Sequence, residues 1–136
     1  HDFGPGDLSS VFALKTLLRR EPGVDPVRIG MYGISRGGMM TLLAMREVSW
    51  TKSAVVVGAL TDLATVRDYR PELVEEAYKR YFKISRNELR RRSAIYFAHE
   101  LSRKTPLLVL HGGADVACRP KDAVAFRAIK AMGFSD

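Results

Sequence analysis

The feature that most constrains the fold of this chain is the pentapeptide Gly33-Ile34-Ser35-Arg36-Gly37, which has the pattern Gly-x-Ser-x-Gly. An apolar run at 27–32 precedes it, and apolar residues at helical spacing follow it over 38–47. A strand, a tight turn and a helix in this order form the layout of a nucleophile elbow. Glycine suits such a turn because a strand that reverses into a helix crowds its own backbone. We therefore expect Ser35 at the tip of a sharp turn between a strand and a helix.

The chemistry of an elbow follows from this geometry. The turn lifts the Ser35 hydroxyl above the sheet and directs the Arg36 N–H and the helix N-terminus at any oxyanion formed there. A serine hydroxyl is a weak nucleophile, because its proton must leave as it attacks. It requires a histidine as general base and a carboxylate that orients the histidine. Ser35 is thus a candidate catalytic nucleophile, and the Arg36 N–H a candidate oxyanion donor.

The candidate carboxylate is Asp115, on a loop that follows a third apolar run at 107–110. Sites in open α/β sheets lie at the carboxyl ends of the strands, so Ser35 and Asp115 are expected at one edge. In elbow enzymes the chain order is serine, acid, histidine. The histidines His1, His99 and His111 all precede Asp115. We expect His111 to orient the loop, His99 to serve packing or the surface, and the general base to lie outside this chain.

The pattern along the chain predicts an α/β fold. Helices are expected over 7–20, capped by Asp7, over 63–82 with an interruption at Pro71, over 87–103 and over 121–132. The runs 27–32, 53–58 and 107–110 read as strands, and the second, apolar on both faces, is typical of a parallel sheet with helices on both faces. Three strands are few for such a sheet. The expectation is one part of a larger catalytic domain, truncated at both ends, with a basic helical insertion at about 62–104.

Charge is concentrated in that insertion. The formal net charge is +7, and nine basic residues against two acidic ones between Lys79 and Lys104 account for all of it. Such a stretch either binds an anionic partner or is the solvated face of helices. Its aromatic residues fall in adjacent pairs, more like core anchors than a base-stacking platform. We expect the solvated face and no nucleic-acid partner.

Other functional classes receive little support from the sequence. With 136 residues the chain amounts to at most one domain, and 46% hydrophobic and 27% charged residues indicate a globular protein. No apolar run approaches the roughly 20 residues that cross a bilayer, and no signal peptide is visible. The three histidines and the lone Cys118 show no metal-ligand spacing, and no phosphate-binding or dinucleotide loop is present. We expect no metal, no cofactor and no membrane partner; one cysteine favours a reducing compartment such as the cytoplasm.

The segments 2–7, 24–40, 54–63 and 107–115 together resemble the catalytic domain of the prolyl oligopeptidase family of α/β-hydrolases. The resemblance covers nearly the whole chain. It implies a serine peptidase or related acyl hydrolase acting on short peptides, with Ser35 as nucleophile and Asp115 as triad acid. It also places the histidine beyond residue 136 and the second oxyanion donor upstream of His1. Arg36 stands where many peptidase members have tyrosine.

Three hypotheses about function follow. The first is a serine peptidase that forms an acyl-enzyme on Ser35, the chain as given being inactive or nearly so without its histidine. The second is a carboxylesterase on small acyl esters, since esters and peptides pass through the same tetrahedral chemistry. The third is a non-catalytic module whose basic helices bind an anionic partner. The sequence does not specify the oligomeric state.

Overall fold

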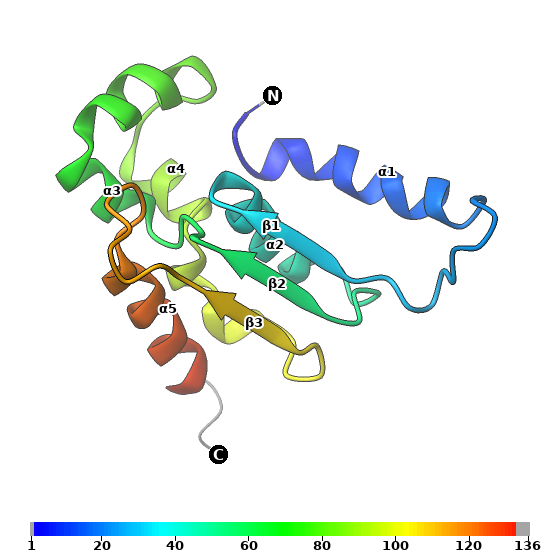
Figure 1. Ribbon diagram of the computed structural model, residues 1–136. Coiled ribbons are helices and arrows are strands. Elements are labelled where there is room, and N and C mark those ends of the chain that lie inside the picture. The colour runs from blue at the N-terminus through cyan, green and yellow to red at the C-terminus, as the bar shows by residue number, and fades with distance from the viewer. Residues whose placement is uncertain (1, 133–136) are drawn as a thin grey trace.

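A three-stranded parallel sheet forms the centre of the protein (Figure 1). The computed structural model describes residues 2–132. The strands are β1 (Met31–Ile34), β2 (Ala54–Val57) and β3 (Leu107–Leu110), in the spatial order β1-β2-β3. Their register aligns Ile34 with Val57 and Val57 with Leu110, so the three strands end level with one another. The loops that leave these carboxyl ends therefore meet at one edge of the sheet.

Helices connect the strands. They are α1 (Leu8–Leu18), α2 (Arg36–Glu47), α3 (Leu63–Tyr69), α4 (Arg86–Arg91) and α5 (Pro120–Met132). Single helical turns lie at Pro5–Asp7, Leu73–Ala77, Tyr78–Arg80, Ala94–Tyr96 and Ala98–Glu100. Helix α2 packs against β1 and β2 and lies behind the sheet in Figure 1, while α1 flanks the β1 edge. The core between α2 and the sheet includes the fully buried Met39, Leu42 and Val56.

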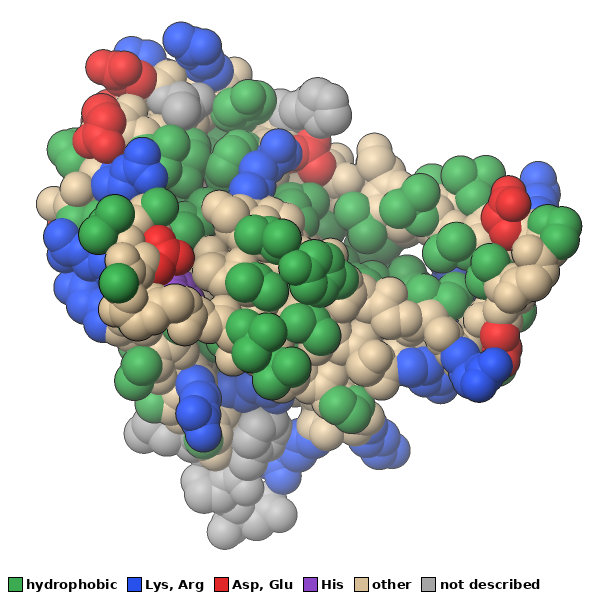
Figure 2. Space-filling view, viewed as in Figure 1, with side chains coloured by type: hydrophobic (Ala, Val, Ile, Leu, Met, Phe, Trp, Pro, Cys, Tyr) green, Lys and Arg blue, Asp and Glu red, His purple; other side chains and the backbone are tan. Residues whose placement is uncertain are grey.

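The two faces of the sheet differ in burial. Ala54 and Val56 face the helices and are buried. On the opposite face, four large side chains are between 46% and 65% exposed: Tyr32, Ile34, Leu108 and Leu110. Figure 2 shows apolar side chains gathered over the sheet on this face. The α/β class and the parallel sheet are confirmed, but in the part of the chain that the structure describes the helices do not cover both faces.

Several predicted boundaries are wrong for local reasons. The first strand begins at Met31, because 25–28 form a turn in which the Asp25 side chain accepts from the Val27 N–H at 3.0 Å and from Arg28 Nε at 2.6 Å. Asp7 does not cap α1 with its side chain. Its carboxylate instead accepts from Arg36 Nη2 at 2.7 Å. The prediction of β3 is confirmed, and that of α5 is correct to one residue.

The region between β2 and β3 is helical, as predicted, but it does not form two long helices. Helix α3 ends at Tyr69, just before the predicted interruption at Pro71. The second predicted helix stops after Arg91, because Ser93 is extended and its hydroxyl accepts from the Leu63 N–H at 2.8 Å. The contact with Leu63 holds the start of α3 against the end of α4, so a distant partner overrides the local helical preference.

The elbow is packed with no room for side chains at two glycines. A Cβ on Gly33 would lie 2.2 Å from the Gly37 carbonyl oxygen, and one on Gly38 would lie 2.6 Å from Ala59 Cβ. A Cβ on Gly37 would meet nothing within 4 Å. The close approach between α2 and the segment after β2 thus depends on Gly38, although the pentapeptide pattern pointed to Gly37.

Arg92 fastens the N-terminal segment to the helical region. Its side chain is 2% exposed, and it donates to the carbonyl oxygens of Asp2 at 2.9 Å, Phe3 at 3.2 Å and Glu88 at 3.1 Å. It also pairs with the carboxylates of Asp2 and Glu88, and its hydrogen bond to the Glu88 carboxylate holds the pKa of Glu88 below its usual value. The prediction of a solvated basic face is therefore wrong for this residue. A buried guanidinium persists here because its donors are paired.

Replacing Gly38 with alanine should destabilise the protein by about 1–3 kcal/mol, because the added methyl group cannot fit against Ala59 without a backbone shift. The matched control is Gly37→Ala, at an open helical position, which should stabilise it by about 0.5–1 kcal/mol. Urea denaturation of the purified variants measures both changes. Equal stability of the two variants would contradict the steric argument.

Replacing Arg92 with methionine should cost about 3 kcal/mol of unfolding free energy, because it leaves buried carbonyl groups without their donors. Arg91→Met is the control: that side chain is 56% exposed and also pairs with Glu88. Its loss should change stability by no more than about 0.5 kcal/mol. Thermal and urea unfolding of both variants tests the difference, and a similar cost for the two would refute the structural role of Arg92.

Candidate active site

Ser35 occupies a strained turn at the carboxyl end of β1. Its backbone torsions are φ 53° and ψ −118°, a left-handed conformation that a side-chain-bearing residue rarely adopts. Its N–H donates to the Val57 carbonyl oxygen at 2.8 Å, which ties the turn to β2. The residue is exposed. The geometry therefore presents the serine at the surface just beyond the sheet.

Arg36 is the first residue of α2, so its N–H has no acceptor within the helix. Its side chain turns toward the N-terminal segment. There Nη2 donates to Asp7 Oδ2 at 2.7 Å, and the guanidinium lies 4.5 Å from the centre of the Phe3 ring. The sequence pointed only to the backbone of Arg36, whereas its side chain also holds Phe3 beside the elbow.

Asp115 lies on the loop after β3, at the same edge of the sheet as Ser35. Its Oδ1 accepts from the N–H groups of Ala117 and Cys118, each at 2.9 Å. Its Oδ2 lies 3.5 Å from His111 Nε2 and would lie 3.2 Å from a Cβ on Gly58. One oxygen thus shapes the loop, and the carboxylate reaches toward the end of β2.

Neither histidine of the described residues is arranged as a base for Ser35. His111 is nearly buried, and its Nε2 donates to the Cys118 carbonyl oxygen at 2.6 Å. That bond fits the predicted role of His111 in orienting the loop. The His99 side chain is 58% exposed, and its Nε2 lies 3.9 Å from Glu100 Oε1. His1 lies outside the described residues.

A pocket of about 280 Å³ opens beside Ser35. Its walls come from segments far apart in the sequence and include Phe3, Leu60, Arg70, Tyr78 and Cys118. Burial raises the pKa of the Cys118 thiol, and a hydrogen bond with the Ser35 side chain partly offsets this effect. Apart from Ser35 and Arg36, sequence reasoning assigned no role at the site to any of these residues. Two of them, Leu60 and Cys118, have one signal in the sequence: they lie shortly after the carboxyl ends of β2 and β3.

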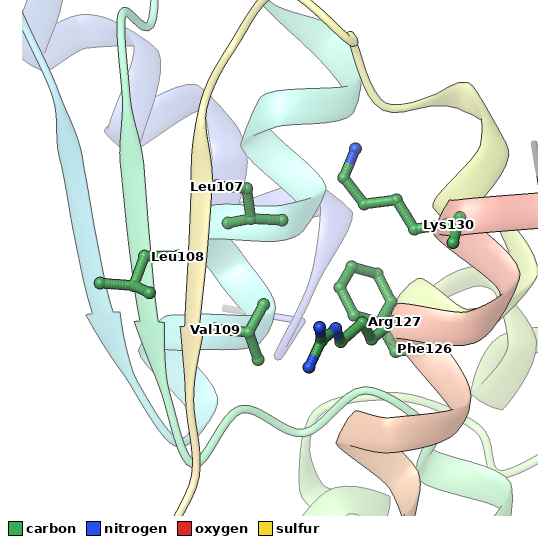
Figure 3. A pocket seen from close by; sticks show the side chains of 7 residues that line it. Leu107, Leu108, Val109, Phe126, Arg127 and Lys130 are labelled. Carbon is green, nitrogen blue, oxygen red and sulfur yellow. The ribbon is translucent and has the colours of Figure 1, made fainter. Parts of the chain in front are cut away.

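Other features of the described residues lie away from this site. The largely apolar cavity between β3 and α5, about 450 Å³, is lined by Leu107, Val109 and Phe126 (Figure 3) and does not include Ser35. Within 2–132 no group of three potential metal ligands is found, and none of the helices there is long and apolar enough to span a membrane. Eight of the nine basic residues in 79–104 are exposed, and none of the nine lines the pocket beside Ser35.

Comparison with known proteins identifies relatives of this chain. It is 30% identical over 137 aligned positions to the uncharacterized peptidase YuxL of Bacillus subtilis, an alignment that covers 97% of this chain and 20% of that protein. A puromycin-hydrolyzing peptidase of Mycobacterium tuberculosis has a TM-score of 0.82 and 21% identity, with 97% of this chain and 20% of that chain covered. An acylaminoacyl peptidase solved with Z-Gly-Gly-Phe-chloromethyl ketone has a TM-score of 0.77 and 21% identity, over 94% of this chain and 21% of that chain.

The structural likenesses show that the fold is that of α/β-hydrolase peptidases, over part of their length. The chain spans about a fifth of the length of each of these relatives. Residues 4–132 match the sequence pattern of the prolyl oligopeptidase family, which extends from the segment before α1 to the end of α5. The chain therefore belongs to the prolyl oligopeptidase family, a family of serine peptidases.

Proposed function

We propose that this chain is part of the catalytic domain of a serine peptidase in which Ser35 is the nucleophile and Asp115 the triad acid. The observation that carries the proposal is the strained, exposed conformation of Ser35 at φ 53° and ψ −118°. Strain of this kind costs free energy and persists only where the surrounding structure fixes it. At the tip of a strand–turn–helix elbow, it presents the hydroxyl to a substrate carbonyl.

The Arg36 N–H supports the same mechanism. A tetrahedral intermediate on Ser35 carries a negative oxygen, which needs donors aligned in advance. The Arg36 N–H lies at the start of a 12-residue helix, where free N–H groups and the helix dipole favour negative charge. A second donor and the general base complete the site from elsewhere in the longer protein. Asp115 would orient that base, and His111 would keep the Asp115 loop in place through Cys118.

The proposed substrates are short peptides. The chain belongs to a peptidase family, and one structural relative is known in complex with the peptide-like inhibitor Z-Gly-Gly-Phe-chloromethyl ketone. A pocket of about 280 Å³ beside Ser35 is of a size for a single side chain rather than for a large ligand. Turnover of an aminoacyl-peptide and of a simple aryl ester by the full-length protein separates the two hydrolase hypotheses. Cleavage of the ester alone would favour a carboxylesterase.

Replacing Ser35 with alanine in the full-length protein should lower peptide turnover by on the order of 10⁴-fold or more, because no acyl-enzyme can form. It should also abolish labelling by a fluorophosphonate probe, which reacts with activated serines. The control is Ser10→Ala, an exposed position on α1. Labelling that survives in the Ser35 variant would place the nucleophile elsewhere.

Replacing Asp115 with asparagine should lower kcat by on the order of 10⁴-fold, because an amide cannot hold the histidine in the required tautomer. Asparagine retains an oxygen for the N–H groups of Ala117 and Cys118, so the loop should keep its shape. Asp68→Asn, an exposed site on α3, serves as the control. Steady-state kinetics on one peptide measures both variants; a loss below about tenfold for Asp115→Asn would assign the triad acid to another residue.

A further inference from the structure

The pocket beside Ser35 combines positive charge with an unpaired buried hydroxyl. Its described lining residues include the guanidinium groups of Arg36 and Arg70 and no carboxylate. The remaining walls are mostly apolar, with Phe3, Leu60 and Leu73 among them. In a small apolar pocket, such polar groups determine which substrate group fits.

Arg36 is already engaged within the protein. Its Nη2 lies 2.7 Å from Asp7 Oδ2, in a pair whose acidic partner is only 12% exposed. Its guanidinium also lies against the Phe3 ring, 4.5 Å from the centroid. The charge of Arg36 is thus neutralised by Asp7, and its role in the pocket is to position the Phe3 wall.

Arg70 is held at the pocket with much of its donor capacity unused. It follows α3 and precedes Pro71, and its backbone N–H donates to the Val66 carbonyl oxygen at 2.8 Å. One side-chain nitrogen, Nε, contacts Glu72 Oε1 at 3.3 Å, in an exposed pair of the weak kind. A guanidinium carries five N–H donors, so this contact leaves others for a ligand.

The Tyr78 hydroxyl provides the second, independent observation. Tyr78 is 1% exposed, lines the pocket, and its hydroxyl has no hydrogen-bond partner among the described residues. Burial raises the pKa of Tyr78 well above its usual value, and the positive charge of Arg70 opposes the rise. The phenol therefore stays protonated and can donate. A buried donor without a partner is uncommon in proteins, so it points to a ligand that supplies the acceptor.

We infer that this pocket binds a carboxylate of the substrate, that of an aspartate or glutamate side chain next to the scissile bond; this inference rests on the proposed peptidase function. Arg70 can offer a carboxylate two parallel donors, and Tyr78 can offer a third. The apolar wall of Phe3, Leu60 and Leu73 accommodates the methylene groups of the acidic side chain. The carboxylates of Asp115 and Asp122 act on the nearby Cys118 thiol, but neither lines the pocket.

Binding tests the inference without requiring catalysis. The full-length protein carrying Ser35→Ala is titrated by calorimetry with a blocked tripeptide that has a central glutamate and with its glutamine counterpart. The glutamate peptide should bind at least about tenfold more tightly. Arg70→Met should remove the preference, Tyr78→Phe should weaken glutamate binding several-fold at nearly constant volume, and Arg67→Met, an exposed residue of α3 paired with Glu75, should change nothing.

Each outcome decides the assignment. Equal binding of the two peptides, or a preference that survives Arg70→Met, overturns it. A third peptide, with glutamine and a free C-terminal carboxylate, separates the two sources of negative charge. Tight binding of this peptide alone would assign the pocket to a chain terminus and overturn the side-chain assignment.

The proposed peptidase function is judged separately, on protein with Ser35 intact. Fluorophosphonate labelling of Ser35 with a higher kcat/KM for the glutamate than for the glutamine substrate supports both proposals. Labelling and hydrolysis with no such difference in kcat/KM overturns the carboxylate assignment alone. No labelling and no hydrolysis, with the binding preference intact, overturns the peptidase function but leaves the carboxylate site supported.

Discussion

The arrangement of the site depends on one steric constraint, the contact between the start of α2 and the segment that follows β2. Gly38 brings the helix so close to Ala59 that a single methyl group would lie 2.6 Å from Ala59 Cβ. Gly33 allows the same helix to fold back over the end of β1. The segment between Gly33 and Gly38 must therefore turn sharply from β1 into α2, and Ser35 in this segment has a positive φ. The packing of the glycines thus supplies the free energy that holds the serine in a strained conformation.

Two arginines extend this arrangement to the N-terminal segment. Arg92 binds the carbonyl groups of Asp2 and Phe3 from a position about 90 residues away in the chain, and Arg36 reaches Phe3 and Asp7 from the elbow itself. Phe3, which also has positive φ, becomes a wall of the pocket beside Ser35. An arginine at a helix end reads as a surface residue, because its partners are not neighbours in the sequence. For this reason the pattern of the basic stretch predicts a solvated face, although Arg92 within it is buried.

What the sequence could predict was local. The elbow, β3 and α5 each follow from a short pattern, and the structure places them close to their predicted bounds. The apolar Val27 predicts a strand from residue 27, whereas β1 begins at Met31. The difference arises because the Asp25 side chain accepts from the Val27 N–H and closes a turn there. The helix expected over 87–103 ends after Arg91. Its early end has no local signature in the sequence, because the Ser93 hydroxyl accepts a hydrogen bond from the distant Leu63 N–H. Ser35 could be proposed from the Gly-x-Ser-x-Gly pattern, and Asp115 from its place after an apolar run, since strand ends converge in a parallel sheet.

The pocket illustrates why catalytic residues are easier to predict than specificity. The nucleophile needs a fixed backbone geometry, which leaves a glycine pattern in the sequence. Selectivity needs only that suitable side chains converge. Here Arg70 comes from the residue that follows α3 and Tyr78 from a short helical turn, and neither lies in a recognisable motif. Pro71 disfavours a helical conformation at Arg70, so α3 ends at Tyr69. Arg70 is thereby left outside the helix, where its side chain lines the pocket. One elbow can therefore serve different substrates through changes in this connecting region, while the strained turn that carries the chemistry stays the same.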